Sequence, residues 1–289
     1  MPQADQLALV FLNGISFGML LFLLAAGLVL MLGIMNIVNL AHGSFYMLAG
    51  FIGIAVAIKT GNFLLGAVAG MFAIGFIGLV MERFFLRRLP GHIEQMLFTL
   101  GCVYIIYDLS RVAWGSNPQY LPPPEVLTGS VPIGDLQYPI YRLAIIGFGA
   151  IIAFGLWLFL EKTRFGAIIR AGADDKEMVE GIGIDIKLVF TMVFTLAALL
   201  AGLSGVLATP VLTANLTLDW QVLTLAFVVI VVGGLRTLKG ALIGSLLIGI
   251  VDSVGIFFFP ELAMFLMFGV TALILAFRPK GLIGYGGLR

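Results

Sequence analysis

The sequence predicts an all-α fold, namely a polytopic bundle of transmembrane helices. Of its 289 residues, 61% are hydrophobic and only 11% are charged, and the mean hydropathy is +1.13. Soluble domains are charged at about a quarter of their positions. Because hydrocarbon offers no partners to free backbone groups, apolar runs of this kind cross a membrane as helices. We expect residues 1–289 to form a single transmembrane domain.

About eight or nine apolar runs are candidates for membrane spans. Crossing about 30 Å of hydrocarbon takes roughly 20 helical residues. Several candidates are shorter than this or adjoin their neighbours, which leaves the count open by one. The candidates are approximately 7–31, 38–58, 63–81, 96–113, 139–160, 188–210, 221–235, 242–259 and 262–277.

The basic residues orient these spans. Lys and Arg are enriched in cytoplasmic connections, and alternation of the spans places most of the 16 basic residues on one side. That side includes the basic residues within 83–88, 162–187, 236–239 and 278–289, so the C-terminus is expected in the cytoplasm. The N-terminus is external if nine spans are real, and cytoplasmic if one of them is a half-helix.

Two connections are unusually long, and the first covers about 114–138. It contains five prolines and no Lys or Arg. Proline stops helices, and the lack of positive charge is typical of an external loop. We expect either a surface connector or part of a docking surface for an extracytoplasmic partner.

The second long connection, about 161–187, is charged and punctuated by glycine. Its middle, Ala171–Glu180, is predicted to be a short helix that stops at Gly181 and Gly183. A connector between helices needs only about 2–8 residues. We therefore favour a helix that docks on a partner protein over a solvated connector. Its acidic and exposed side is expected to carry Asp174, Asp175, Glu177 and Met178.

The sequence lacks the usual apparatus of an enzyme. It contains no GxxxxGK[ST] phosphate loop, no HExxH motif and no GxSxG motif. His42 and His92, its two histidines, lie in different segments, and Cys102 is its one cysteine. We therefore expect no catalytic residues, no metal site and no cofactor in this chain.

Polar residues inside the apolar segments are the candidate substrate pathway. Polar side chains at this depth are costly unless they pair or line a cavity. Asn39, His42 and Gly43 could break the helix and present free amides to an anionic group. The alternative is that the polar side chains hydrogen-bond neighbouring helices and hold the bundle together. The candidates are Asn36, Asn39, His42, Ser44, Tyr46 and the mid-span Asp252.

Glycine accounts for 37 of the 289 residues, a clearly larger share than the usual background of about 7%. Small residues at helical spacing let transmembrane helices approach closely. We interpret the glycine pairs as packing within one bundle, with a dimer interface as the alternative. Examples are Gly14/Gly18, Gly66/Gly70 and Gly240/Gly244.

Three segments resemble the permease family of branched-chain amino acid importers, which are ATP-binding-cassette transporters. They are GLVLMLGIMNIVNLAHGSFYMLAGF, RFGAIIRAGADDKEMVEGIGIDIKLVFTMVFTLAALLAGLSGVL and VVGGLRTLKGALIGSLLIGIV. Length and hydropathy resemble the shorter of that family's two permease subunits over essentially the whole chain. The turn from Leu235 to Lys239 departs from the Gly-Ser-Pro-like turn of many relatives.

This resemblance implies partners and a location in the plasma (inner) membrane. The partners are a second, homologous permease, two cytoplasmic ATPase subunits that bind ATP and Mg, and an extracytoplasmic solute-binding protein. The resemblance also implies that Arg170–Gly183 is a coupling helix seated on an ATPase. Residues that match the family pattern there are Arg164, Gly166, Arg170, Ala171 and Gly181.

The function implied by the resemblance is uptake of branched-chain or related amino acids, by alternating access that the partner ATPases drive. Two alternatives stay open. The chain could belong to an importer of urea or short amides, which members of this family also carry, or it could be a stand-alone secondary transporter or channel. A stand-alone transporter would move solute when purified alone, whereas an importer permease would not.

Overall fold

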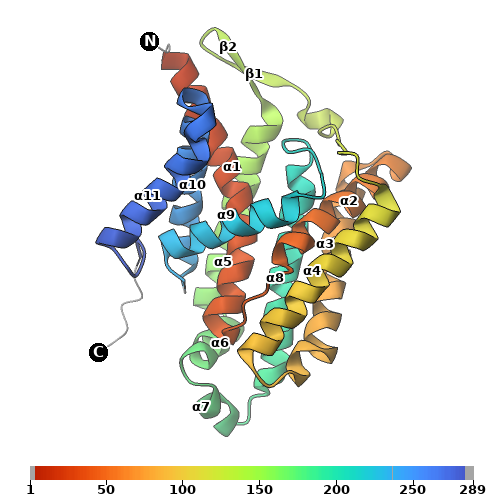
Figure 1. Cartoon of the computed structure of the whole chain (residues 1–289), viewed down its shortest axis with the longest axis vertical. Helices are drawn as coiled ribbons and strands as arrows, with labels where there is room; N and C mark the ends of the chain where they lie inside the picture. Colours follow the sequence, from red (N-terminus) through yellow and green to blue (C-terminus); the bar gives the residue numbers. More distant parts are fainter. Residues whose placement is uncertain (1–3, 236, 284–289) are drawn as a thin grey trace.

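The computed structural model is a bundle of long helices and describes residues 4–235 and 237–283 (Figure 1). Within those ranges, eight helices are long and apolar enough to cross a membrane, which confirms the all-α transmembrane fold. They are α1 (Ala4–Leu30), α2 (His42–Thr60), α3 (Phe63–Phe84), α4 (His92–Trp114), α5 (Ile140–Lys162), α8 (Ile186–Ala208), α10 (Leu238–Phe258) and α11 (Ala263–Phe277), which reaches 18 residues together with the turn that precedes it (Pro260–Phe277). Short 3-10 turns are η2 (Leu86–Arg88), η3 (Glu125–Leu127) and η4 (Pro260–Leu262).

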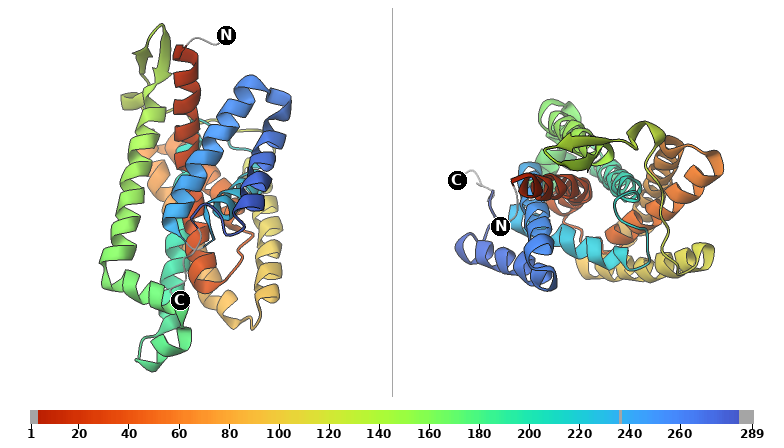
Figure 2. Two further views of the ribbon diagram at one scale, coloured as in Figure 1. Left: turned by 90° about the vertical axis from the view of Figure 1, so that its left-hand side faces the viewer. Right: turned by 90° about the horizontal axis from the view of Figure 1, so that it is seen from above.

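The expected span at 221–235 is not a span. The helix there, α9 (Leu218–Gly233), has 16 residues and is about 24 Å long at 1.5 Å per residue. That length falls short of the roughly 30 Å of hydrocarbon. α9, drawn in cyan, lies crosswise at mid-height of the bundle in the side views (Figure 1 and the left panel of Figure 2). Composition could not separate it from a span because it is as apolar as its neighbours.

Glycines bring the helices close together, as the small-residue pairs predicted. α1 crosses α10 so closely that a Cβ on Gly14 would lie 2.7 Å from the Ile250 Cα. A Cβ on Gly249 would collide with the Gly14 backbone oxygen. In α3, a Cβ on Gly70 would lie 2.8 Å from the backbone oxygen of Ala49 in α2. All three predicted pairs are used within one chain in this way.

One end of the bundle carries an antiparallel hairpin of two strands, β1 (Ser130–Ile133) and β2 (Leu136–Pro139). We call this the hairpin end (Figure 1). α1 starts beside the hairpin, and the amide of Asp135 donates to Asp5 Oδ2 over 3.4 Å. The connection 114–138 therefore contains regular structure, and its role as a docking surface stays a prediction.

The charged loop lies at the opposite end, which we call the α7 end. It forms two short helices, α6 (Arg164–Asp174) and α7 (Lys176–Gly181), which extend beyond the long helices (Figure 1). The single helix expected over Ala171–Glu180, and with it a continuous coupling helix over Arg170–Gly183, is therefore wrong. The chain is extended at Asp175, whose side chain caps α7. Aspartate favours such an N-cap because its side chain bonds the backbone amides that follow it.

The crossing of α1 and α10 gives a test of this packing. Gly249→Ala should lower stability by about 1–3 kcal/mol, the usual cost of overpacking, because its methyl group would meet the Gly14 backbone oxygen. Gly101→Ala in α4 is the matched control, since a Cβ there has nothing within 4 Å. Thermal unfolding in one detergent compares the variants. Equal apparent Tm values would contradict the close crossing.

Candidate functional site

The chain is broken after α1, where the polar residues predicted a break. α1 runs into a π-helical turn, η1 (Met31–Met35), and the helical hydrogen bonding stops before α2. Asn36 ends the turn with a φ of 56°, a left-handed conformation that Asn adopts more readily than most other residues with a Cβ. His42 and Gly43 are not part of the break, because they are the first residues of α2.

Side chains satisfy the backbone of the break. The Leu40 amide donates to Thr99 Oγ1 of α4 over 3.2 Å, and the Ala41 amide donates to Asn39 Oδ1 over 3.0 Å. Asn39 is fully buried, and its Nδ2 lies 3.7 Å from the sulfur of Met31. Non-helical backbone is tolerated at membrane depth when protein encloses it in this way. The sequence did not identify Thr99, because it lies 59 positions along the chain from Leu40, whose amide donates the hydrogen bond to it.

His42 fixes the start of α2 against α1. It is fully buried, and its Nε2 donates to the Leu24 carbonyl over 3.0 Å. The ring fits because it faces Gly27, where a Cβ would lie 2.9 Å from Nε2. With Nε2 as the donor, Nδ1 is an acceptor. Nδ1 is buried and has no hydrogen-bond partner among the described residues.

Two more of the predicted pathway residues lie close by on α2. Ser44 is buried, and its Oγ has no hydrogen-bond partner in the described part of the chain. Tyr46 is buried against α8, where a Cβ on Gly205 would collide with the Tyr46 backbone oxygen. The start of α2 therefore gathers several of the predicted residues at one buried junction.

Asp219 belongs to this junction, and sequence reasoning missed it. It is buried at the start of α9, and its backbone oxygen occupies the space that a Cβ on Gly43 would need. Its Oδ1 accepts from the Trp220 amide over 2.7 Å, while Oδ2 is buried without a partner within the described ranges. Acidic residues are common in the first turn of a helix. Only its contact with α2 therefore distinguishes Asp219 from an ordinary first-turn acidic residue. Buried polar atoms normally have partners, so Asp219 Oδ2 is an exception within the described residues.

The structure does not bring Asp252 to this junction. Asp252 is half-buried on α10, near the level at which α10 packs on Gly14. His42 packs on Gly27, and the two glycines are about 20 Å apart along α1. Asn36 is exposed at the end of η1. Within residues 4–235 and 237–283, no three His, Cys, Asp or Glu side chains are grouped so that they could hold a metal ion.

A cavity of about 330 Å³ joins the break to the charged loop. Gly33 of η1 lines one side, Glu161 and Arg170 line another, and Lys239 contributes from the start of α10. Arg170 and Glu161 lie 3.9 Å apart with side chains 45% and 48% exposed, so this ion pair adds little stability. The cavity places residues of the charged loop beside the broken segment.

Helix caps and a glycine hold the charged loop to the bundle. A Cβ on Gly166 would collide with the Leu160 backbone oxygen, so α6 lies directly against the end of α5. Thr163 Oγ1 accepts from the Gly166 amide over 3.0 Å, and Asp185 Oδ1 accepts from the Lys187 amide at the start of α8 over 3.0 Å. Because a side-chain cap begins each helix, the loop is an ordered unit.

The outer side of this unit presents most of the residues expected to contact a partner. Met178 is 53% exposed, and Gly181 is exposed with nothing within 4 Å of its Cβ position. Gly166 and Ala171 are buried or half-buried, so they position α6 against the bundle. The other exposed residues of the expected set are Arg164, Arg170, Asp174, Asp175 and Glu177.

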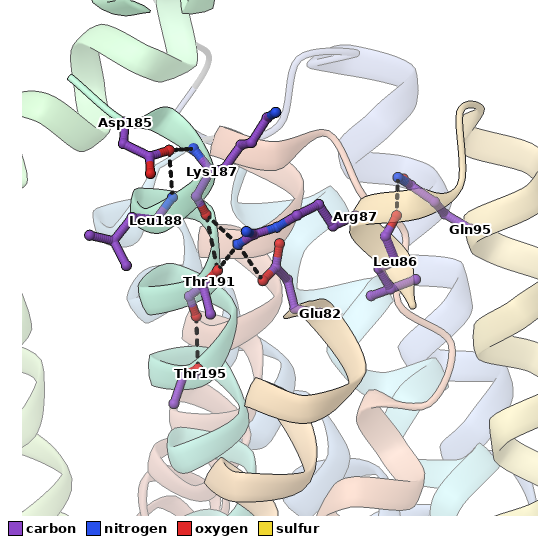
Figure 3. Close-up of polar contacts among 9 residues, drawn as sticks. All are labelled: Glu82, Leu86, Arg87, Gln95, Asp185, Lys187, Leu188, Thr191 and Thr195. Atoms are coloured by element: carbon purple, nitrogen blue, oxygen red, sulfur yellow. Dashed lines mark hydrogen bonds and ion pairs between the residues drawn. The ribbon is translucent and has the colours of Figure 1, made fainter. Parts of the chain in front are cut away.

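Arg87 of η2 connects the start of α8 to α3 (Figure 3). Its Nη2 donates to Glu82 Oε2 over 3.3 Å, to the Lys187 carbonyl over 2.9 Å and to Thr191 Oγ1. Glu82 is only 3% exposed, so its charge depends on this guanidinium group. The Gln95 amide of α4 donates to carbonyls in and beside η2. The base of α8 is thereby fastened to α3 and, through η2, to α4.

The chain is similar to known membrane proteins along nearly its whole length. The family described as the permease component of branched-chain amino acid transport systems matches residues 10–275. The high-affinity branched-chain amino acid transport system permease protein BraD of Pseudomonas aeruginosa is 25% identical over 98% of each chain. The corresponding LivH protein of Escherichia coli is 26% identical over 94% of each chain.

A solved structure has a similar fold. PsaBC from Streptococcus pneumoniae, in complex with Fab, superposes with a TM-score of 0.50 and 15% sequence identity. The match covers 93% of this chain and 89% of the other. At that identity the similarity concerns the arrangement of the helices alone.

The connection through Arg87 can be tested by a double-mutant cycle. Arg87→Met should cost about 1–3 kcal/mol, because Glu82 is left buried and charged without its partner. Glu82→Gln removes that charge, so the double variant should lose less stability than the sum of the two single variants. Unfolding in detergent measures all four proteins. Additive losses would show that the pair is not coupled.

Proposed function

Since this chain belongs to the family of permease components of branched-chain amino acid transport systems, we propose that it is the membrane subunit of an ATP-binding-cassette importer. It moves branched-chain or related amino acids into the cytoplasm. The observation that carries this proposal is the helix pair α6–α7, which is ordered, charged and extended beyond one end of an apolar bundle. A transporter that works alone needs only a short connector at that position.

In this proposal the α7 end faces the cytoplasm. Arg87 bonds the start of α8, and Arg170 and Lys239 line one cavity, so basic residues from distant segments gather at this end. Basic residues are enriched in cytoplasmic connections. Arg236 and Arg289, which the sequence assigns to the same side, lie outside the described residues. The hairpin end then faces outward, toward a solute-binding protein that delivers the amino acid. The start of α1 lies at this end (Figure 1), so this proposal places it outside although one of the nine candidates is too short to span, contrary to the cytoplasmic N-terminus expected in that case.

Two cytoplasmic ATPase subunits bind ATP and Mg and dock on α6–α7. Met178 offers them an apolar contact, and the acidic residues around it form a polar rim, as in other protein interfaces. ATP drives alternating access only if the ATPases bind the inward-facing and outward-facing states with different affinity. A second, homologous permease subunit completes the pathway.

α8 links the docked helices to the buried junction. Its start is capped by Asp185 and held to α3 by Arg87. Further along, Gly205 packs on the backbone of Tyr46 in α2. A rigid shift of α8 therefore reaches the start of α2, where His42 lies.

In this proposal the amino acid passes beside the junction of α2 and α9. His42 Nδ1, Ser44 Oγ and Asp219 Oδ2 are buried polar atoms without partners in the part of the chain that the structure describes. An amino acid carries an ammonium donor and a carboxylate acceptor, which such atoms can bind. Asn36 and Asp252 remain candidates for other points along the pathway.

Reconstitution in liposomes tests the proposed function. Radiolabelled leucine should be taken up only when this chain is combined with the second permease, the ATPases with ATP and Mg, and the loaded binding protein. Uptake by the chain alone would contradict the proposal and favour a stand-alone transporter. Uptake of urea or a short amide instead of leucine would replace the proposed substrate class.

Gly181 offers a test of the docking surface, because nothing lies within 4 Å of its Cβ position. Gly181→Trp should leave the fold and the membrane level unchanged but lower ATP-driven uptake about tenfold or more, as expected when an interface is blocked. Gly155→Trp in α5 is the control, since its Cβ position is equally open. Normal uptake by Gly181→Trp would count against docking at α7.

A further inference from the structure

One face of α9 is polar although the helix lies inside the bundle. The side of α9 that packs on the other helices is apolar apart from Asp219. The opposite side exposes Trp220, Gln221 and Thr224, with Trp220 44% exposed. We call these three residues the α9 face.

The polar groups of the α9 face are only partly satisfied. The Thr224 hydroxyl donates to the Trp220 carbonyl over 2.8 Å. The side-chain amide of Gln221 has no hydrogen-bond partner among the described residues. An amide side chain has two donor hydrogens and an acceptor oxygen. Leaving these groups in hydrocarbon without partners is costly.

The α9 face lies at the depth of the hydrocarbon. α9 crosses the bundle at mid-height between the hairpin end and the α7 end (Figure 1, Figure 2). The face therefore does not lie at the headgroup level, where lipid and water together solvate a Trp or a Gln.

α11 shows the kind of surface that this chain presents to lipid. Its exposed large side chains are apolar throughout, in contrast to those of α9. They are Met264, Phe265, Leu266, Phe268, Leu273 and Phe277. A polar face on a short crosswise helix requires a polar neighbour, which lipid tails do not supply.

We propose that the α9 face lines the solute pathway and contacts the transported amino acid. This rests on the proposed function, in which the pathway runs between this chain and a second permease. The Gln221 amide oxygen accepts from the ammonium group of the solute, and its nitrogen donates to the carboxylate. The Trp220 ring offers an apolar surface to the solute side chain. The ligand class is a zwitterionic amino acid with an apolar side chain.

The α9 face is also placed to respond to the ATPases. Trp220 follows Asp219, whose backbone packs against Gly43 at the start of α2. α2 packs in turn on α8 through Tyr46 and Gly205. A shift of α8 during the transport cycle therefore moves the α9 face, so that it can change its exposure between the two sides of the membrane.

Cysteine labelling in membrane vesicles tests whether the α9 face is wet. Thr224→Cys, Gln221→Cys and the α11 control Leu273→Cys are each made in a Cys102→Ser chain within the assembled transporter, since Cys102 is the one native thiol. A charged, membrane-impermeant thiol reagent should label the α9 variants about tenfold or more faster than the control, because thiolates form in water and not in lipid. Leucine with its binding protein should slow the labelling.

Two results would overturn different claims. Labelling of Thr224→Cys and Gln221→Cys no faster than Leu273→Cys, in complexes that still take up leucine, would show that water does not reach the α9 face and that it does not line the pathway, while the proposed function stands. If the Cys102→Ser transporter and the unmodified one take up no amino acid with all partners present, the proposed function fails instead.

Gln221→Leu separates solute contact from a merely structural role. It should lower leucine uptake about tenfold or more, since a polar group that binds the solute is lost, while the amount of assembled complex and the ATPase activity stay unchanged. Gln6→Leu, at an exposed position near the start of α1, is the control. Normal uptake by Gln221→Leu would exclude contact between this side chain and the amino acid.

Discussion

A polar group inside hydrocarbon must find a partner within the protein, and this constraint shapes the structure around the break. After Asn36 the backbone leaves helical bonding until α2 begins, so each free amide there would be costly. Thr99 of α4 and the side chain of Asn39 satisfy two of these amides. His42 then ties the start of α2 to the Leu24 carbonyl of α1. The break is therefore stable only because α1 and α4 enclose it, and the same segment facing lipid could not stay unwound.

The structure around the break also requires close contact between helix backbones. The helices that meet there approach so closely that no side chain fits between them. Gly43 admits the backbone oxygen of Asp219, and Gly205 admits that of Tyr46. Lipid tails are as apolar as the helices, so van der Waals contact rather than hydrophobic exclusion must stabilise such crossings. The glycines at these positions thus build the same junction that gathers the unpartnered polar atoms.

The local features of this protein were predictable from the sequence, and the tertiary ones were not. Polar residues in an apolar run predicted the break, and a run of charge predicted the position of the α6–α7 unit. The N-cap at Asp175 was missed because the residues on either side of it suit a single helix. The crosswise path of α9 was missed because its composition is that of a span. Asp219 was missed because only its contact with Gly43 separates it from an ordinary first-turn acid.

The break also decides where movement can occur. α1 packs closely on α10 at Gly14 and on α8 at Gly27, while α2 packs on α8 at Gly205 and on α9 at Gly43. Because the chain between η1 and α2 is not helical, α2 can change its angle to α1 without breaking hydrogen bonds within either helix. The bonds that must rearrange, such as those of Thr99 and His42, are worth about 0.5–1.5 kcal/mol each. That sum is comparable to the 1–3 kcal/mol by which one site typically biases another. In the proposed cycle, a movement of α8 therefore carries α2 through Gly205, and it must also change the contacts of α8 with α1, where Ser204 Oγ donates to the Leu20 carbonyl over 2.8 Å.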